Sequence, residues 1–282
     1  MTELTPLETL LGVEQGDDLP LPDRLAGFYG RLRFPTTGGQ YVISNFVTTL
    51  DGVVALMAPG HESGGAVSGY NNHDRMVMGI LRAVSDAVVV GAGTLRSVPE
   101  HLWTAEFIFP SLADEYAQLR TSLGKPEPPL NVIVTSSGNL VADLRVFQSR
   151  DVPVLIVTTP RGAKRIDALS MPPSVKVIAV EEDGPVGAGA ILNATNEARQ
   201  SDMVLVEGGP LLMGDFFAER RLHEQFITLA PQVAGRDGSV ERPGLVSGKR
   251  FAPDDPRWGA LVSVKRAGDH LFLRYSFMQP DS

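Results

Sequence analysis

The chain has 282 residues, of which 43% are hydrophobic and 21% are charged, and it contains no cysteine. This composition fits one large α/β domain or two small ones, and it excludes disulfides, iron–sulfur clusters, thiolate zinc sites and a cysteine nucleophile. The formal net charge of −8 argues against a nucleic-acid partner, and no apolar run approaches the roughly 20 residues that span a bilayer.

Residues 1–35 are expected to form a helical N-terminal arm. One short apolar stripe lies at residues 7–11, and a second runs through residues 25–32 with the spacing i, i+3, i+4, i+7. Two prolines separate the stripes. We expect the arm to pack on the main domain, residues 36–282, or on a second subunit.

From residue 41 onward the pattern predicts strands that alternate with helices. The run Ala87–Val90 is wholly apolar, which is typical of a strand buried on both faces of a parallel sheet. The last two strands form a hairpin at Ala267-Gly268. These patterns predict an α/β fold with a mostly parallel mixed sheet, flanking helices and a C-terminal antiparallel hairpin. The strands are predicted at 41–48, 87–90, 131–135, 154–158, 175–180, 203–206, 226–229, 260–265 and 270–277, and the helices at 71–83, 111–122, from 160, 189–199 and 211–220.

Glycine turns follow two of the predicted buried strands. One reads Gly91-Ala92-Gly93-Thr94-Leu95-Arg96, and the other reads Glu207-Gly208-Gly209-Pro210-Leu211. Such glycines often only turn the chain, but here the turns share one sheet edge, and their N–H groups can face a phosphate. Arg96 stands where the Rossmann fingerprint has its third glycine, so we expect a cofactor groove of another kind.

Hydroxyl and basic side chains at the same edge predict the type of cofactor. Thr135 and Ser136, with Ser137 next, end one strand, and Arg161 follows another. Together with Arg96 they are suited to a 2′-phosphate, and no acidic residue follows the first glycine turn at the distance of an NAD-type ribose contact. The sequence therefore favours NADPH over NADH.

A polar segment after the first long strand indicates the substrate end of the site. It contains Asn45 and Thr49 and closes with Asp51-Gly52. Asp51 either makes only the hydrogen bonds of a turn or orients a substrate together with Asn45. Ser68 precedes a helix that carries Arg75, and this arginine is either solvated or holds a substrate phosphate.

Several motifs together resemble the C-terminal reductase domain of bacterial riboflavin-biosynthesis deaminase–reductases and its stand-alone pyrimidine-reductase relatives. The resemblance covers roughly residues 40–277, in the family's order. The motifs are Thr49-Leu50-Asp51-Gly52, Leu81-Arg82-Ala83, Asp86 to Arg96, Val204 to Pro210 with Leu212, Gly214 and Phe216, and Leu229-Ala230-Pro231.

This resemblance implies a dihydrofolate-reductase-like fold, a homodimer, and NADPH bound across the turns. It implies hydride transfer to C1′ of a phosphorylated ribosylamino-pyrimidine, with Asp51 and Glu207 near the nicotinamide. It also implies that Thr135 and Ser136 lie at the 2′-phosphate. The cofactor phosphates would contact Gly91, Gly93, Thr94, Gly208, Gly209 and Pro210.

The chain departs from the family pattern in three respects. Val53 stands after Asp51-Gly52, where the family usually has Lys or Arg. The next helix, with Asn72-His73-Asp74-Arg75, has fewer arginines than the family's, so the candidate cations of a phosphosugar pocket are Arg75 and Arg82. The fused zinc deaminase is missing, because a cysteine-free chain has no Pro-Cys-x-x-Cys motif.

Three alternatives remain open or are set aside. A pterin or other heterocycle reductase shares the fold, and a non-catalytic NADP-binding protein is a further possibility. The sequence has neither a G-x-S-x-G elbow nor H-E-x-x-H spacing, so we expect no hydrolase and no metal site. An acidic N-terminus without a basic run argues against a signal peptide, and we expect a cytoplasmic protein with a small-molecule substrate.

Overall fold

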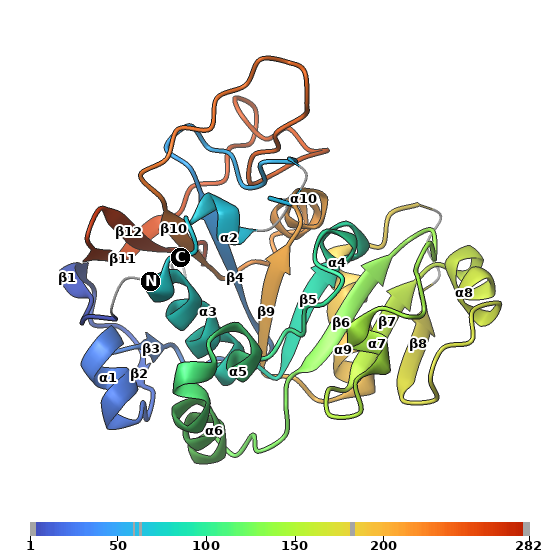
Figure 1. The fold of residues 1–282 in the computed structure, drawn as a ribbon, viewed down its shortest axis with the longest axis horizontal. Coiled ribbons are helices and arrows are strands. Elements are labelled where there is room, and N and C mark those ends of the chain that lie inside the picture. Colours follow the sequence, from blue (N-terminus) through green and yellow to red (C-terminus); the bar gives the residue numbers. More distant parts are fainter. Residues whose placement is uncertain (1–3, 59, 62–63, 181–183, 279–282) are drawn as a thin grey trace.

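The computed structural model describes residues 4–58, 60–61, 64–180 and 184–278 of the chain. Its main feature is a ten-stranded sheet in the order β1-β11-β12-β10-β4-β9-β5-β6-β7-β8 (Figure 1). Neighbouring strands from β10 to β8 are parallel, and β12, β11 and β1 add an antiparallel edge. The strands are β1 Glu8–Gly12, β4 Tyr41–Thr48, β5 Ala87–Gly91, β6 Leu130–Thr135, β7 Val154–Thr158, β8 Val175–Ala179, β9 Met203–Gly208, β10 Glu224–Leu229, β11 Ala260–Ala267 and β12 His270–Ser276.

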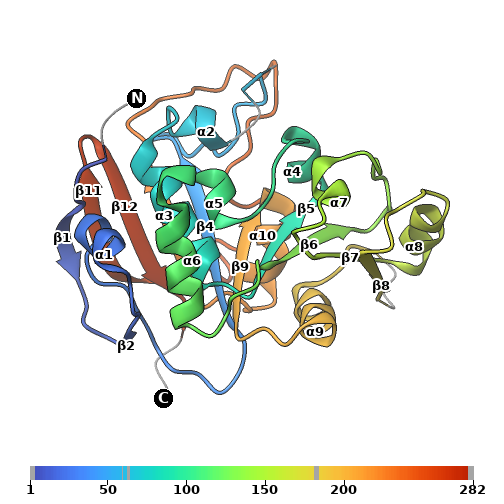
Figure 2. The ribbon, with the colours of Figure 1, turned by 60° about the horizontal axis from the view of Figure 1, so that its bottom comes forward.

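Helices cover both faces of the parallel part of the sheet. The group around α3 lies on one face, and α9 and α10 lie on the other (Figures 1 and 2). Because both faces are covered, every residue of Ala87–Val90 is buried, as the sequence predicts. The helices are α1 Asp23–Tyr29, α2 Gly64–Val67, α3 Asn72–Val84, α4 Ala92–Ser97, α5 Ala105–Ile108, α6 Ala113–Ser122, α7 Arg145–Gln148, α8 Pro160–Asp167, α9 Ala188–Ala198 and α10 Pro210–Ala218, with a short 3-10 helix at Pro110–Leu112.

Two hydrophobic clusters fill the space between the sheet and the helices. The first joins α1, α3 and α6 to one face of the sheet, and the second joins α9 and α10 to the opposite face. Alternate residues of one strand serve the two clusters, as Val88 and Val89 of β5 do. This arrangement confirms the predicted α/β class and the C-terminal hairpin. No helix within the described ranges has the length and apolarity needed to cross a membrane.

The first part of the N-terminal arm is a strand, and the prediction of a helix there was wrong. Residues Glu8–Gly12 form β1, which pairs antiparallel with β11 at the edge of the main sheet. The second stripe does form a helix, α1, which buries Leu25 and Tyr29. Between them Asp17–Asp18 (β2) pairs with Arg33–Phe34 (β3). The free edge of β11 determines this outcome, because it offers the first stripe a ladder of backbone hydrogen bonds.

Candidate functional site

The two glycine turns lie side by side at the carboxyl edge of the sheet. Strands β5 and β9 are parallel neighbours, so the chain leaves both of them at the same edge. A Cβ atom added to Gly209 would lie 3.3 Å from Thr94 Oγ1, and one added to Gly91 would lie 3.7 Å from the Gly208 carbonyl oxygen. The predicted juxtaposition of these four residues is therefore present in the fold.

Each of these turns leads directly into a helix. Helix α4 starts at Ala92, and α10 starts with Pro210 at its first position. First-turn N–H groups have no acceptor within their own helix, so they are available to an anion above the turns. Gly93 and Leu211 face outward here: a Cβ on Gly93 meets open space, and the Leu211 side chain is 67% exposed.

The hydroxyls predicted to bind a 2′-phosphate both accept backbone hydrogen bonds, one within its own turn and one from the segment before α9. Thr135 is buried, and its Oγ1 accepts the N–H of Gly138 at 3.2 Å. Ser136 Oγ accepts the N–H of Val186 at 3.2 Å, and the Ser136 carbonyl oxygen accepts the Thr159 hydroxyl at 2.8 Å. The bond from Thr159 holds the turns after β6 and β7 together, and the bond from Val186 attaches the segment before α9 to the β6 turn. The two hydroxyls therefore help to shape this end of the carboxyl edge, and Thr135 is the more deeply buried of the two residues.

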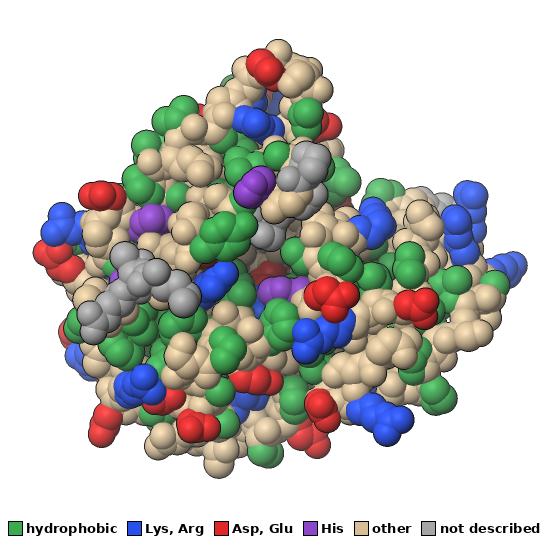
Figure 3. All heavy atoms as spheres, in the orientation of Figure 1, with side chains coloured by type: hydrophobic (Ala, Val, Ile, Leu, Met, Phe, Trp, Pro, Cys, Tyr) green, Lys and Arg blue, Asp and Glu red, His purple; other side chains and the backbone are tan. Residues whose placement is uncertain are grey.

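Basic side chains surround this end of the carboxyl edge. Helix α8 carries Arg161, Lys164 and Arg165, all exposed, and Figure 3 shows cations gathered over it. Arg96 is exposed at the end of α4, where its Nη1 lies 3.5 Å from the Asn139 carbonyl oxygen of the loop after β6. Positive charge is therefore present where the prediction placed the 2′-phosphate, and it comes from arginine and lysine.

Glu207 lies near the end of β9 in a buried ion pair with Arg82 of α3. The Arg82 Nη2 atom is 2.6 Å from Oε2, and Nε is 2.9 Å from Oε1. The two side chains are only 1% and 7% exposed. This bidentate pair holds the Glu207 carboxyl group in a fixed orientation beside the second glycine turn. It also removes Arg82 from the cations that could reach a substrate phosphate, contrary to the sequence prediction.

His101 extends this network from the segment before α5. Its Nε2 lies 3.0 Å from Arg82 Nη2, while Arg82 Nη1 donates to the carbonyl oxygens of Leu102 and Thr104 at 3.3 and 3.1 Å. Burial, with the nearby positive charge of Arg82, lowers the pKa of His101 to about 2. The ring is therefore neutral and accepts from Arg82. Sequence analysis missed His101, because no local pattern links it to Arg82.

Asp51 anchors one loop to another. Its carboxylate accepts the Thr49 hydroxyl at 2.6 Å and the N–H groups of Ala234 and Gly235 at 3.0 and 2.7 Å. Arg236 adds a hydrogen bond to the Asp51 carbonyl oxygen at 3.0 Å. The hydroxyl and the two N–H groups hold the pKa of Asp51 well below its usual range. Asp51 thus makes a hydrogen bond within its own turn, to Thr49, and two more to a second loop.

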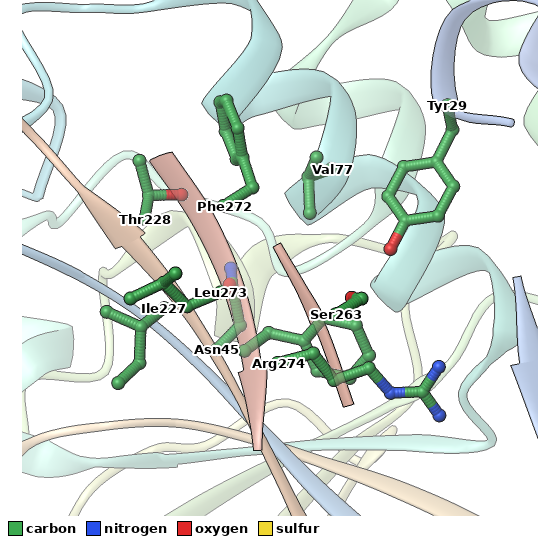
Figure 4. A pocket seen from close by; sticks show the side chains of 10 residues that line it. Tyr29, Asn45, Val77, Ile227, Thr228, Ser263, Phe272, Leu273 and Arg274 are labelled. Carbon is green, nitrogen blue, oxygen red and sulfur yellow. The ribbon is translucent and has the colours of Figure 1, made fainter. Parts of the chain in front are cut away.

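Asn45, Ser68 and Arg75 occupy different surroundings. Asn45 of β4 is buried and lines a small cavity with Thr228 and Phe272 (Figure 4). Ser68 is buried after α2, where its hydroxyl donates to the Gly65 carbonyl oxygen. Arg75 is half-buried, with its guanidinium carbon 5.7 Å from the centre of the Tyr70 ring. Of these three residues, Arg75 is the one that is partly accessible to solvent.

Asp74 is a buried acid beside this group that the sequence analysis did not single out. Hydroxyls of Ser68 and Thr228 hydrogen-bond to its carboxyl group, and burial raises its pKa. His270 of β12 donates from Nε2 to the Ser68 carbonyl oxygen at 3.0 Å and lies 3.2 Å from Asn71 Nδ2. The start of α3 is thus fixed to β10 and β12. The position of Asp74 on the buried face of the predicted helix at 71–83 is the sequence feature that could have identified it.

Figure 3 shows a recess in the surface between the helix group around α3 and the turn that enters α4. Acidic, basic and histidine side chains border it. No cluster of three or more potential metal-ligating side chains is found in the part of the chain that the structure describes.

Residues 40–264 match the RibD C-terminal domain family. The chain belongs to this family. Family membership confirms the resemblance seen in the motifs, and with it the dihydrofolate-reductase-like fold. No curated protein matches the sequence.

Three solved structures share this fold at low sequence identity. A pyrimidine reductase-like protein from Corynebacterium diphtheriae has a TM-score of 0.64 and 18% identity, over 86% of this chain and 93% of its own. A diaminohydroxyphosphoribosylaminopyrimidine deaminase/5-amino-6-(5-phosphoribosylamino)uracil reductase from Thermotoga maritima has a TM-score of 0.61 and 21% identity. That match covers 84% of this chain but 56% of the Thermotoga protein, so the chain spans about half its length. The riboflavin biosynthesis reductase Rib7 of Saccharomyces cerevisiae has a TM-score of 0.57 and 14% identity, over 86% and 92% of the two chains.

Proposed function

We propose that this RibD C-terminal domain protein is an NADPH-dependent reductase of riboflavin biosynthesis. Its substrate would be a ribosylamino-pyrimidine phosphate, reduced at C1′ of the sugar so that the ring opens to a ribityl chain. The observation that carries the proposal is the close approach of the two glycine turns at the carboxyl edge of a sheet of this family, where a Cβ added to Gly209 would lie 3.3 Å from Thr94 Oγ1. That edge is where open α/β sheets bind their ligands.

The residues at this edge fit a dinucleotide phosphate. Backbone N–H groups at Gly93 and Leu211, together with the Thr94 hydroxyl, would hold the pyrophosphate. Arg161 and Arg96 would hold the 2′-phosphate, because both side chains are exposed at the far end of the edge. Bound there, NADPH supplies the hydride. The chain contributes binding, orientation and the exclusion of water from the reacting carbons.

We assign Glu207 and Asp51 different roles. Glu207 is fixed by Arg82 next to the second glycine turn, so its carboxylate accepts hydrogen bonds from a substrate hydroxyl or amine. Asp51 acts as a positioning residue, since Thr49, Ala234 and Gly235 already donate to its carboxylate. The proton that accompanies the hydride would come from bound water, because Thr49, Ala234 and Gly235 already engage Asp51, and Arg82 already engages Glu207.

A second candidate substrate is a pterin or another heterocycle without a phosphate. Val53 favours it: the side chain is fully buried and its N–H donates to Thr49 Oγ1 at 2.9 Å. No cation therefore faces the substrate from this position, and Arg75 is the predicted phosphate ligand that remains. Competition by ribose 5-phosphate against competition by antifolates separates the two substrate classes.

We further propose that the protein is a homodimer that acts in the cytoplasm. The homodimer follows from the family resemblance. A cysteine-free chain is suited to a reducing compartment, where disulfides do not contribute to stability.

The decisive experiment follows NADPH absorbance with purified protein and the deaminated ribosylamino-pyrimidine phosphate, with NADH in parallel. We expect turnover with NADPH, and at least about a tenfold loss of kcat/KM in Glu207→Gln. Arg161→Ala should weaken NADPH about tenfold and leave NADH unchanged, because a charge-assisted hydrogen bond contributes about 1.5–3 kcal/mol. Lys176→Ala is the matched control, an exposed cation near the start of β8. Tight NADPH binding without turnover would refute the substrate and leave the cofactor site standing.

A further inference from the structure

Tyr70 is an exposed aromatic residue in the turn that leads into α3. The residue is 49% exposed, and its φ of +57° places its backbone in the left-handed region. Aromatic residues are rare there, because the Cβ atom crowds a carbonyl oxygen, whereas glycine adopts the same conformation freely. Gly69, directly before it, is also left-handed, with φ +65°. The turn thus uses glycine at one left-handed position and keeps a large aromatic ring at the other.

Anchors on both sides of Tyr70 hold this conformation. The Tyr70 N–H donates to the Gly65 carbonyl oxygen at 2.7 Å. His270 of β12 donates from Nε2 to the Ser68 carbonyl oxygen at 3.0 Å, and its Nδ1 lies 3.2 Å from Asn71 Nδ2. Strained backbone persists only where the surrounding contacts hold it, and it is concentrated at ligand sites. The backbone of this turn is therefore fixed, while the Tyr70 side chain is left half exposed.

Arg75 of α3 contacts the Tyr70 ring. Its guanidinium carbon lies 5.7 Å from the ring centre, which is within the range of a cation–π contact. This contact covers part of the ring and limits its rotation. Because Tyr70 is still 49% exposed, aromatic surface remains on which a second planar group can stack.

Arg75 belongs to a stripe on α3 that leads to the buried ion pair. Arg75, Met78 and Arg82 have the spacing i, i+3, i+7, so they project from one face of the helix. Arg82 binds Glu207 beside the second glycine turn. Met78, between the two arginines, is half-buried and belongs to none of the hydrophobic clusters of the described residues. Apolar surface is therefore available along the stripe between Tyr70 and Glu207.

The N-terminal half of this stripe lies at the carboxyl edge of the sheet. Strands β4 and β5 are parallel, so the helix that connects them starts at the edge where the glycine turns lie. At about 1.5 Å per residue, Arg75 is about 10 Å nearer to that edge than Arg82. Helical side chains lean toward the helix N-terminus, and Arg75 therefore leans toward Tyr70. The recess in Figure 3 lies between this helix group and the turn that enters α4.

We propose that Tyr70 is the stacking platform for the planar heterocycle of the substrate. This proposal rests on the reductase function proposed above and adds a specificity-determining residue to it. Arg75 supports the ring, the heterocycle stacks on the remaining surface, and Met78 provides an apolar contact on the way to Glu207. Stacking depends on the flat π-face of a heterocycle and not on its hydrogen-bonding groups, so the platform accepts a pyrimidine or a pterin.

The sheet order separates this platform from the proposed cofactor site. Tyr70 follows β4, whereas the cofactor groups are proposed over β9, β5 and β6. In the order β4-β9-β5-β6, the substrate heterocycle and the cofactor therefore approach β9 from opposite sides and meet near Glu207. The occupant of the platform is the substrate ring and not the nicotinamide.

Calorimetric titration of the full chain saturated with NADP⁺ tests the platform. The oxidised cofactor has no hydride to give, so Kd is measured without turnover. The titrants are the deaminated ribosylamino-pyrimidine phosphate, pterin-6-carboxylate and ribose 5-phosphate. We expect Tyr70→Gly to raise the Kd of the heterocycle at least about tenfold and to leave the Kd of ribose 5-phosphate and of NADP⁺ unchanged. Tyr70→Phe keeps the ring and should bind like wild type.

Two further readouts separate a platform from a residue that only packs. Tyr70→Gly relieves a left-handed backbone, so Tm should stay unchanged or rise by up to about 3 °C. In turnover it should raise KM and leave kcat unchanged, because stacking binds ground state and transition state alike. Arg220→Gly is the matched control: Arg220 is exposed with φ +53°, between α10 and the start of β10 at the opposite edge, and its loss should not change the Kd of the heterocycle.

The outcomes distinguish the platform from the proposed substrate. Pterin-6-carboxylate binding that Tyr70→Gly weakens, without any binding of the pyrimidine, would support the platform and refute the pyrimidine substrate. Pyrimidine turnover with an unchanged Kd in Tyr70→Gly would do the reverse. The platform would also be overturned if neither heterocycle binds wild type, if Tyr70→Gly weakens NADP⁺ or ribose 5-phosphate as much as the heterocycle, or if its Tm falls by more than about 3 °C.

Discussion

Replacing Arg82 with methionine tests whether the pair with Glu207 holds the site together. The variant keeps a long side chain in the core but leaves the Glu207 carboxylate, 7% exposed, without its cation. The carbonyl oxygens of Leu102 and Thr104 also lose their donor. Removing one partner of a buried ion pair costs about 3–5 kcal/mol, mostly because the remaining charge is stranded.

This cost converts to a shift in melting temperature. At about 2.1 cal/mol/K per residue, a chain of this length has an unfolding entropy of roughly 0.6 kcal/mol/K. The expected decrease in Tm is therefore about 5–8 °C, measured by differential scanning calorimetry at pH 7. Adding Glu207→Gln to Arg82→Met should recover part of the loss, since the stranded charge is then gone.

The surface pair of Arg24 with Glu115 provides the matched control. Its N–O distance is also 2.6 Å, but the arginine side chain is 55% exposed. Arg24→Met should cost at most about 1 kcal/mol, or less than 2 °C. If Arg82→Met is no more harmful than Arg24→Met, the argument that burial makes the Glu207 pair structural is refuted.

Three further predictions concern the loops around the site. Asp51→Asn should loosen the segment at 232–236 and speed its proteolysis, with Asp237→Asn as the control. Because the pKa of Asp51 is lowered in the folded state, the difference in stability between wild type and variant should be complete above about pH 4 and should shrink as the pH falls below that value. A difference in stability that stays constant down to about pH 3 would count against this mechanism. Thr159→Ala should lower the free energy of unfolding, measured in urea, by about 1–2 kcal/mol. Thr159 caps α8 by accepting the Gly162 N–H at 3.1 Å, and its hydroxyl donates to the Ser136 carbonyl oxygen. Thr159→Ser should keep most of the wild-type stability, and an equal loss in both variants would contradict the capping role. Gly138→Ala should destabilise the protein by well over the roughly 1–2 kcal/mol that a non-glycine residue costs in the left-handed conformation, because its Cβ would overlap the Gly162 carbonyl oxygen. Gly268 is also left-handed, but a Cβ there would meet open space. Gly268→Ala should therefore show only the backbone cost in the same urea assay.

Much of the fold could be predicted because its signals are local. Runs such as Ala87–Val90 and Val154–Thr158 become buried strands wherever helices cover both faces, and the alternating helices provide that cover. The glycine turns are equally local, and their placement at one edge follows from parallel strands. The boundaries of β4 and β7 match the predicted ranges for this reason.

The site was predicted less completely, because a residue's role depends on partners far along the chain. Arg82 has an ordinary helical spacing, and only folding shows that Glu207, 125 residues away, neutralises it. Thr135 has a hydroxyl suited to a phosphate, but in the folded chain that hydroxyl oxygen accepts the N–H of Gly138 within its own turn. His101 and Asp74 carry no local motif, and their burial beside Arg82 and Ser68 gives them their properties.

The sequence by itself determined the alternation of strands and helices, the common edge of the glycine turns and the absence of thiol chemistry, since each depends on residue types or short spacings. The tertiary structure decided which carboxylates and cations are already paired and which remain available to a ligand. It also decided that residues 8–12 form a strand, because the free edge of β11, more than 240 positions later in the chain, offers them backbone partners that a short isolated helix cannot match.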